Sequence, residues 1–263
     1  MKKNSSIVIR LLKAFCTSII VLIVFCPLHL FAEDYQAFIE KGDEYYHDFD
    51  NSKALAEYEK AYELASEEFE VLMRLTRAYN DAGEDLDSEE SKPYFENAVK
   101  YAELLLEKFP ENVDTYYYLS VSYGNLALFK GGKTKVKLSR KVKQNAEKAI
   151  ELDPQRAEPY VVLGIYYREI ANLNRFLKAF AKIFFGGLPK ATNEDSEKSL
   201  LKAIELKPTY INAHFQLGRT YEKMKEKDKA IANYEKILEL PQADHQDNAI
   251  KTKAEKRLKK LKK

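Results

Sequence analysis

The stretch INAHFQLGRTYEKMKEKDKAIANYEKI, residues 211–237, decides the fold of this 263-residue chain. Its apolar and small side chains recur at spacings of three and four, which places them on one face of a helix. A polar segment divides the pattern, so the stretch predicts two antiparallel helices joined by a short turn. The first helix carries Leu217, Gly218 and Tyr221, and the second carries Ala230, Tyr234 and Ile237.

The same pattern occurs near the N-terminus, starting at Tyr35. The matching positions are Phe38, Gly42 and Tyr45, followed by Ala54, Tyr58 and Ala61. Each set fits a helix, a turn and a second helix in about 34 residues, which is the period of the tetratricopeptide repeat. The chain is therefore predicted to consist of stacked helix pairs.

Glycines inside the first helices need a physical reason, because a helix-interior glycine costs about 1 kcal/mol relative to alanine. We expect the second helix of each pair to approach closely at these points. The predicted packing residues are Gly42 with Ala54, Gly164 with Ala203, and Gly218 with Ala230.

Three further copies lie in the middle of the chain, with longer connections between their two helices. They carry Leu72, Leu75 and Tyr79 with Ala98, Ala102 and Leu105; Tyr116, Leu119 and Tyr123 with Ala146 and Ala149; and Tyr160, Leu163, Gly164 and Tyr167 with Leu200 and Ala203. The connection in the first of these, residues 83–92, is polar and is predicted to be a loop. Pro110, Pro154 and Pro208 stand where one repeat passes to the next, as expected of a residue that cannot continue a helix.

We therefore predict an all-α, tetratricopeptide-repeat-like, right-handed solenoid of about five helix pairs at residues 33–242, because only stacked neighbours bury the apolar faces of such pairs. A basic C-terminal helix is predicted at residues 243–263. Its Ile250, Ala254, Leu258 and Leu261 would cover the last repeat, while its lysines face solvent. Contact of this basic tail with an anionic lipid or polyanion is the alternative.

Residues 1–32 differ from the rest of the chain. Four basic residues precede an uncharged apolar stretch at 14–32, which predicts an export signal cleaved near Ala32 and a periplasmic or secreted protein. An uncleaved membrane anchor is the alternative, since the stretch is long enough to span a bilayer. Cleavage would remove Cys16 and Cys26 and leave 39 basic against 41 acidic residues, without a cysteine for a disulfide or a thiolate metal site.

The sequence offers no convergent set of catalytic or metal-ligating residues, so no enzyme, cofactor or metal is predicted, and no nucleic-acid partner. His47 lies in an expected turn and His245 in a polar linker, while His214 occupies a repeat position that packs in the core or lines a groove. The string at 131–134, GGKT, lacks the first glycine of a phosphate loop and is predicted to be a basic turn. The acidic run at 84–90 lacks the spacing of a calcium loop.

The insertion in the fourth repeat is predicted to be an amphipathic helix at residues 172–185. Phe176, Phe180 and Phe184 fall on one face with two leucines, and basic residues fall on another. Such a helix either lies on a membrane surface, lines an apolar groove, or folds back onto the solenoid as core.

Several segments resemble the regulator of microtubule dynamics family. They are residues 142–154, 160–167 and the extended helix through Asn172 to 185, then Gly186, Gly187, Leu188, Pro189, Ala191 and Thr192, the acidic pair Glu194 and Asp195, and residues 201–208. The resemblance covers roughly residues 69–241, and the insertion is its most specific part.

The resemblance implies a helical-repeat domain without enzymatic activity, associated in eukaryotic members with microtubules or organelle membranes and in part with phospholipid. From it we take the fold and a concave groove with Phe176, Phe180 and Phe184 as candidate lining, and His214 is a further candidate from its repeat position. An exported chain would not meet a cytosolic filament. The lysine and asparagine with which related repeat domains grip C-terminal carboxylates are replaced by Ile39 and Asp43.

Two functional hypotheses follow from the sequence. The first is a non-enzymatic adaptor whose concave groove binds a protein or peptide partner. The second is a protein that binds or transfers a lipid or another apolar ligand, or a membrane-anchored relative of the microtubule regulators.

Overall fold

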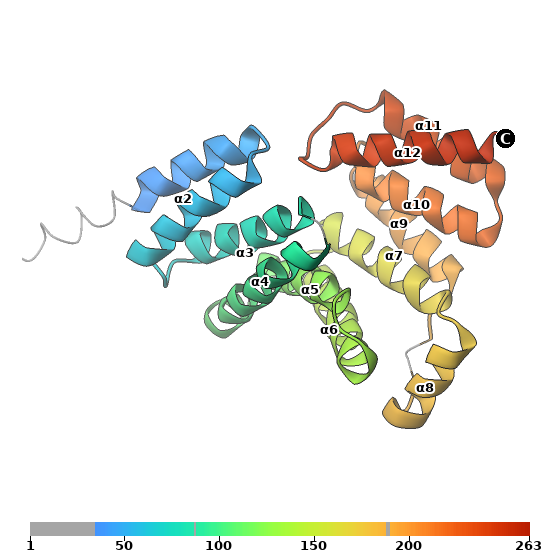
Figure 1. Ribbon diagram of the computed structural model, residues 1–263, viewed down its shortest axis with the longest axis horizontal. Helices are drawn as coiled ribbons and strands as arrows, with labels where there is room; N and C mark the ends of the chain where they lie inside the picture. The colour runs from blue at the N-terminus through green and yellow to red at the C-terminus, as the bar shows by residue number, and fades with distance from the viewer. Residues whose placement is uncertain (1–34, 87, 188–189) are drawn as a thin grey trace, which may run out of the picture. The chain divides into compact units, whose positions relative to one another are not determined.

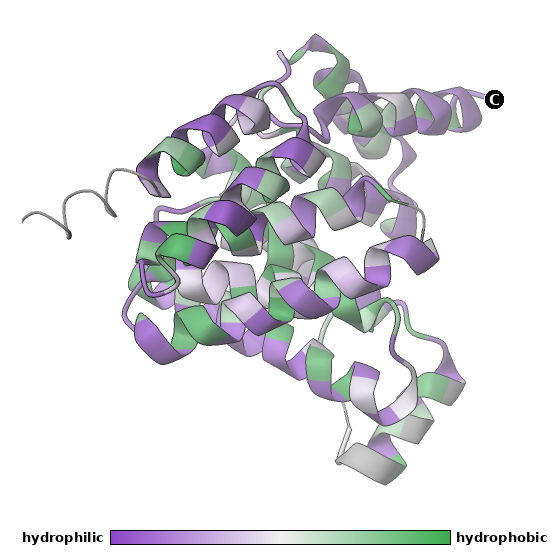
Figure 2. Cartoon of the chain, turned by 60° about the vertical axis from the view of Figure 1, so that its left-hand side comes forward, coloured by the Kyte–Doolittle hydropathy of each residue, from purple (hydrophilic) through white to green (hydrophobic). Residues whose placement is uncertain are grey.

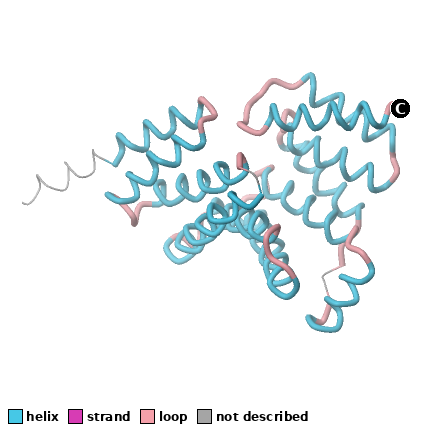
Figure 3. The backbone as a smooth tube through the Cα atoms, in the orientation of Figure 1, coloured by secondary structure: helices cyan, strands magenta, loops and turns pink. Residues whose placement is uncertain are grey.

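The computed structural model describes residues 35–86, 88–187 and 190–263, and the regular secondary structure of these residues is helical throughout (Figures 1 and 3). Residues 35–47 form the first described helix. The others are α2 (Asn51–Leu64), α3 (Phe69–Glu84), α4 (Ser88–Lys108), α5 (Val113–Ala127), α6 (Gly132–Leu152), α7 (Glu158–Ala171), α8 (Arg175–Phe185), α9 (Asn193–Leu206), α10 (Ile211–Met224), α11 (Lys227–Glu239) and α12 (Asp247–Leu261).

The described residues fall into two compact units, divided between Val71 and Leu72. In the first unit, the helix at 35–47 pairs with α2 around Gly42. A Cβ atom on Gly42 would lie only 2.4 Å from Cε1 of Tyr58, whose hydroxyl donates a hydrogen bond of 2.6 Å to Asp43 Oδ1. The glycine therefore makes room for a tyrosine ring from the partner helix.

The second unit is built from antiparallel pairs. Helix α3 meets α4 through the stacked rings of Tyr79 and Tyr101, whose centroids lie 5.4 Å apart. Helix α5 packs on α6, α7 on α9, and α10 on α11, and α12 packs on both α10 and α11 (Figure 1). The predicted all-α, tetratricopeptide-repeat-like fold with a C-terminal capping helix is confirmed, since α12 buries Ile250, Ala254 and Leu258 against the last pair.

Two hydrophobic clusters make up much of the core of this unit. One joins α7, α9, α10, α11 and α12, and the other joins α4, α5, α6 and α7. Both contain residues of α7, so this helix links the clusters. Figure 2 shows the corresponding pattern on the ribbons, with hydrophobic and hydrophilic residues alternating along each helix.

Two helix glycines of the second unit also lie against large side chains. A Cβ atom on Gly164 would lie 2.5 Å from Cγ of Leu200, and one on Gly218 would lie 2.6 Å from Cε1 of Tyr234. The sequence assigned these contacts to the small residues Ala203 and Ala230. Those alanines are fully buried, but the space beside each glycine is filled by a larger side chain one helical turn away from the alanine. Leu200 fills it at Gly164, and Tyr234 fills it at Gly218.

Two connections are more helical than predicted. Helix α3 continues to Glu84 and α4 starts at Ser88, so most of the expected loop at 83–92 is helix. Pro93 lies in the second turn of α4, where it removes one early backbone hydrogen bond without ending the helix. Likewise α6 begins at Gly132, inside the turn expected at 131–134.

Helix α8 occupies the predicted insertion. It begins at Arg175, three residues later than predicted, because Asn174 caps it by accepting a 2.8 Å bond from the backbone N–H of Leu177. It ends at Gly186, whose φ of 69° is left-handed. The side chains of Phe176, Phe180 and Phe184 lie outside the described part of the structure, and so does the predicted leader at 1–32. Among the described residues, no helix has both the length and the apolar composition needed to cross a bilayer.

Candidate functional site: a groove along the first helices of the repeats

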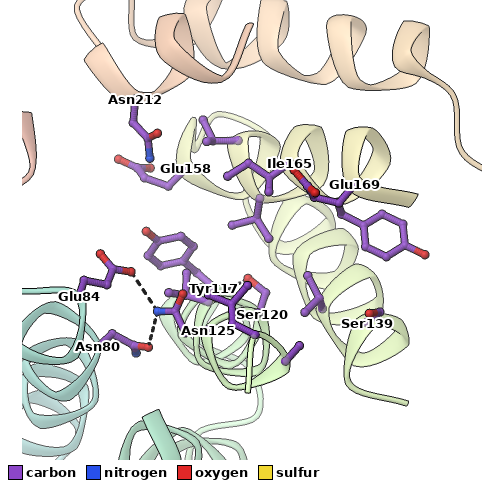
Figure 4. Close-up of a pocket in the computed structure, with 18 of the residues that line it drawn as sticks. Asn80, Glu84, Tyr117, Ser120, Asn125, Ser139, Glu158, Ile165, Glu169 and Asn212 are labelled. Carbon is purple, nitrogen blue, oxygen red and sulfur yellow. Dashed lines mark hydrogen bonds between the residues drawn. The ribbon is translucent and has the colours of Figure 1, made fainter. Parts of the chain in front are cut away.

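A cavity of about 660 Å³ opens in the second unit (Figure 4). Its walls are formed mainly by α5 and α7, which are the first helices of two successive pairs, and α10 contributes Asn212 and Arg219. The end of α3, the first half of α6, the connection before α12 and the start of α12 complete the lining, together with Leu173 and Leu177 of the insertion. The volume lies within the range of about 300–1,000 Å³ that is usual for ligand pockets.

Polar side chains at the end of α3 and on α5 form one end of the groove. Asn125 donates from its amide nitrogen to Asn80 Oδ1 at 3.1 Å and to Glu84 Oε1 at 2.9 Å (Figure 4). Asn80 in turn donates to the hydroxyl oxygen of Ser122 at 2.9 Å. These bonds fix the two amides, and they leave the Asn125 side-chain oxygen as an acceptor at the groove.

The facing wall is apolar. Val161, Val162 and Ile165 of α7 line the cavity, and Val121 of α5 lies on the same surface. Val161 is buried in the core, whereas Ile165 is only partly buried. The side chain of Ile165 therefore presents apolar surface that a ligand can cover.

Charged groups at the rim are held in ion pairs. Glu158 lies 3.5 Å from Lys207 Nζ and 3.6 Å from Arg156 Nε, and Glu169 lies 3.6 Å from Arg219 Nη2. Burial, reinforced by neighbouring acidic groups, raises the pKa of Tyr210 well above its ordinary value. The phenol therefore stays protonated at neutral pH and keeps its hydrogen-bond donor in the groove.

The groove also gathers Asp81, Glu84 and His245, which the sequence did not connect. One ligand-type atom from each lies within 4.8 Å of the others. His245 comes from the connection between α11 and α12, which is ordered by Asp247. The Asp247 carboxylate accepts backbone bonds from Ala243 at 2.8 Å and from Asp244 at 2.9 Å.

Electrostatics in this cluster are strongly perturbed. Burial raises the pKa of Asp81 to about 7, with a further contribution from Glu84 and against the nearby positive charges. Burial lowers the pKa of His245, but the carboxylates of Asp244 and Asp81 outweigh it and raise the value to about 9. Burial also raises the pKa of Glu84, although its side chain opens onto the groove. The pKa values of Asp81, Glu84 and His245 are therefore all raised above their ordinary values.

The predicted site and packing residues that the structure describes lie outside the groove. His214 is buried between Pro208 and α11, with Nε2 at 2.9 Å from the Pro208 carbonyl oxygen and Nδ1 at 3.3 Å from Asn233 Oδ1. It is not among the residues that line the groove. The packing residues Gly42, Gly164 and Gly218 lie inside helix pairs. The sequence did not predict that the groove asparagines and His245 line the cavity, because no local spacing in the sequence relates these residues to one another.

The family profile described as Regulator of microtubule dynamics protein 1-3 matches residues 38–262. The chain belongs to this family. It is 29% identical over 206 residues to Regulator of microtubule dynamics protein 1 of Bos taurus, a match that covers 75% of this chain and 65% of the relative. Against protein 3 of Mus musculus it is 31% identical over 184 residues, covering 69% of this chain and 39% of the relative.

These matches confirm the family predicted from the insertion and extend the similarity to nearly all described residues. The chain nevertheless spans under two thirds of the Bos taurus relative and well under half of the Mus musculus one. Among solved structures, a thermophilic TPR protein of Thermus thermophilus has a TM-score of 0.65 at 19% identity, covering 84% of this chain and 98% of that chain. That likeness shows the fold.

Proposed function

We propose that this family member is a non-enzymatic scaffold that binds a segment of a partner protein in the groove between α3, α5, α7 and α10. The single observation that carries the proposal is the composition of the groove, which runs across the first helices of successive repeats. Solenoids of helical pairs use this concave side for binding, because it presents one continuous surface from several repeats.

The groove chemistry suits an extended peptide. Asn125 offers a side-chain acceptor, and Asn212 lies across the cavity on α10 (Figure 4). Amide side chains can bond to peptide N–H and C=O groups, and they read the backbone without demanding one sequence. The partly exposed Ile165 supplies apolar contact for a side chain of the segment. Affinity would thus come from buried apolar area, and orientation from the amides.

Substituting Ile165 by glutamate tests this proposal. A carboxylate at the centre of the apolar wall must be desolvated when a ligand binds, so we expect affinity to fall by at least about tenfold. Peptides would be selected from a displayed random library with the full chain, and their dissociation constants measured by fluorescence anisotropy. The matched control is Leu201→Glu, which places the same charge at a 47% exposed leucine of α9 outside the groove.

Peptides that lose affinity for Ile165→Glu but not for Leu201→Glu would support binding in the groove. Equal affinity of all three proteins would place the peptide elsewhere and contradict the proposal. Far-UV circular dichroism of each variant would establish that it folds. Asn212→Ala provides a second variant, whose truncation leaves the apolar wall intact.

An apolar small molecule is the second candidate ligand, favoured by the volume of about 660 Å³ and by the valine-rich α7 wall. We expect native mass spectrometry of the purified full chain to show a lipid-sized adduct, because such a molecule would remain in an apolar cavity during purification. The adduct should be lost in Ile165→Glu and kept in Leu201→Glu. A wild-type spectrum with the bare protein mass alone would remove this candidate and leave the peptide proposal standing.

A further inference from the structure

The cluster of Asp81, Glu84 and His245 has the composition of a metal site. Two carboxylates and one imidazole are ligand types that Zn²⁺ and related divalent transition metals accept, whereas Ca²⁺ and Mg²⁺ favour oxygen ligands alone. Asp81 and Glu84 are three positions apart at the end of α3, which puts them on one helical face. His245 reaches the same point from the connection before α12.

The imidazole of His245 is the second observation that points to a ligand. Its side chain is only 6% exposed, and its Nε2 atom is buried without a hydrogen-bond partner. The other ring nitrogen, Nδ1, forms an ion pair with Asp244 Oδ1 at 3.0 Å, which leaves Nε2 as the nitrogen available to a ligand. Asp81 Oδ2 is likewise buried without a hydrogen-bond partner. Buried polar atoms of folded proteins are nearly always bonded, so these orphaned atoms call for an explanation.

We infer that Asp81, Glu84 and His245 bind one divalent transition-metal ion, of the zinc type, in the wall of the groove. The cation would satisfy the orphaned atoms of both Asp81 and His245 and would offset the repulsion between the two carboxylates. Ligand atoms about 2.1 Å from a zinc ion lie no more than about 4.2 Å apart. The three ligand atoms lie within 4.8 Å of one another, which is close to this limit.

The inferred site has a structural and a binding consequence. The ion would tie the connection before α12 to the end of α3, two segments far apart in the sequence. All three ligands line the cavity, so the remaining coordination positions face it and can accept water or a ligand group. The inference does not depend on the identity of the groove's partner.

Titration with Zn²⁺ alone tests the inference. The full chain, stripped with a chelator and then freed of it, would be titrated by isothermal calorimetry. Co²⁺ absorption in the visible range would report on the coordination. We expect one equivalent to bind, and thermal unfolding to shift to higher temperature with added zinc, because an ion bound only by the folded state stabilises it.

Three variants each remove one ligand: Asp81→Asn, Glu84→Gln and His245→Asn. Each should weaken Zn²⁺ binding by at least about tenfold, since even outer-shell changes cost about 10–100-fold. His47→Asn is the matched control, because it removes an exposed histidine of the first unit by the same substitution. It should bind Zn²⁺ like the wild type.

Two results would overturn the inference. One is a wild-type chain that binds no zinc, in which case the cluster is an ion-pair network around a protonated imidazole. The other is binding of equal strength in wild type and in the ligand variants. Should the buried Asp81 or His245 variant fail to fold, Glu84→Gln decides, because its side chain is exposed and the replacement has the same shape. Unchanged affinity in folded Glu84→Gln removes Glu84 from the site and with it the inference.

Discussion

Replacing Gly218 by valine is expected to lower the free energy of unfolding by about 3 kcal/mol or more. A Cβ atom at this position would lie 2.6 Å from Cε1 and 2.8 Å from Cζ of Tyr234. Both separations are far shorter than the contact distance between two carbon atoms, about 3.5–4.0 Å. Valine adds two methyl groups to that Cβ and loses rotamer freedom in a helix, so its cost exceeds that of alanine.

The Tyr234 ring cannot move away from a side chain at position 218, because its surroundings hold it in place. It is fully buried, and the ring of Phe215 lies against it with centroids 5.8 Å apart. Its hydroxyl donates a 2.5 Å bond to Glu222 Oε1, and Arg257 Nη1 donates to both oxygens of that carboxylate at 2.8 and 2.9 Å. Displacing the ring would therefore disturb α10, α11 and α12 together.

Gly124 provides the matched control for this substitution. It lies inside α5, but the nearest atom to a Cβ there would be Val142 Cγ2 at 3.9 Å, an ordinary contact. Gly124→Ala should stabilise the chain by about 0.5–1 kcal/mol through helix propensity alone. Denaturant unfolding followed by far-UV circular dichroism would compare the two. A Gly218→Val variant as stable as the wild type would show that the helix pair tolerates a wider separation.

The helix pairs were predictable because their determinants are local. The stretch at 211–237 contains both the apolar spacing and the polar turn, and α10 and α11 occupy it closely. The repeat prolines were equally informative, since α4, α6 and α9 each end two residues before Pro110, Pro154 or Pro208. A proline blocks continuation of the helix through its own ring, so its effect does not depend on the rest of the fold.

The sequence around the start of α4 contains a signal for a helix start, although its overall composition is typical of a loop. The segment at 83–92 is rich in charged and small residues, which are typical of loops. Yet Glu89 and Glu90 fall in the first turn of α4, where negative charge is favourable because the backbone N–H groups there are unpaired. Acidic residues just before an apolar periodic run thus indicate a helix start as much as a loop.

The cluster in the groove could not have been predicted from spacing. Asp81 and Glu84 belong to α3, and His245 belongs to the connection before α12. Only the stacking of the intervening pairs brings them together. His245 stood between acidic neighbours in a polar stretch, a context that is common at surfaces. The same holds for Asn80 and Asn125, which meet through the packing of α3 on α5.

Removal of Arg168 is expected to have a comparably large effect, about 3–5 kcal/mol for Arg168→Ala. This arginine of α7 is fully buried. Its Nη1 donates to the backbone oxygen of Gln216 at 3.0 Å, and its Nη2 donates to Gln216 Oε1 at 2.9 Å. Burial, with Arg219 nearby, lowers the pKa of Arg168 to about 10, so the guanidinium stays charged at neutral pH.

Two contributions add up in Arg168→Ala, and a second variant separates them. Alanine loses the charged hydrogen bonds to Gln216 and to the carboxylate of Glu169, worth about 1.5–3 kcal/mol each at most, and it leaves a cavity between α7 and α10. Arg168→Met fills much of the same volume without the bonds. Because well-packed apolar residues often replace a buried charge at little cost, we expect Arg168→Met to lose clearly less stability than Arg168→Ala in the same unfolding assay. Equal losses would assign the effect to the hydrogen bonds, and no loss in either would contradict a role of Arg168 in joining the two groove helices.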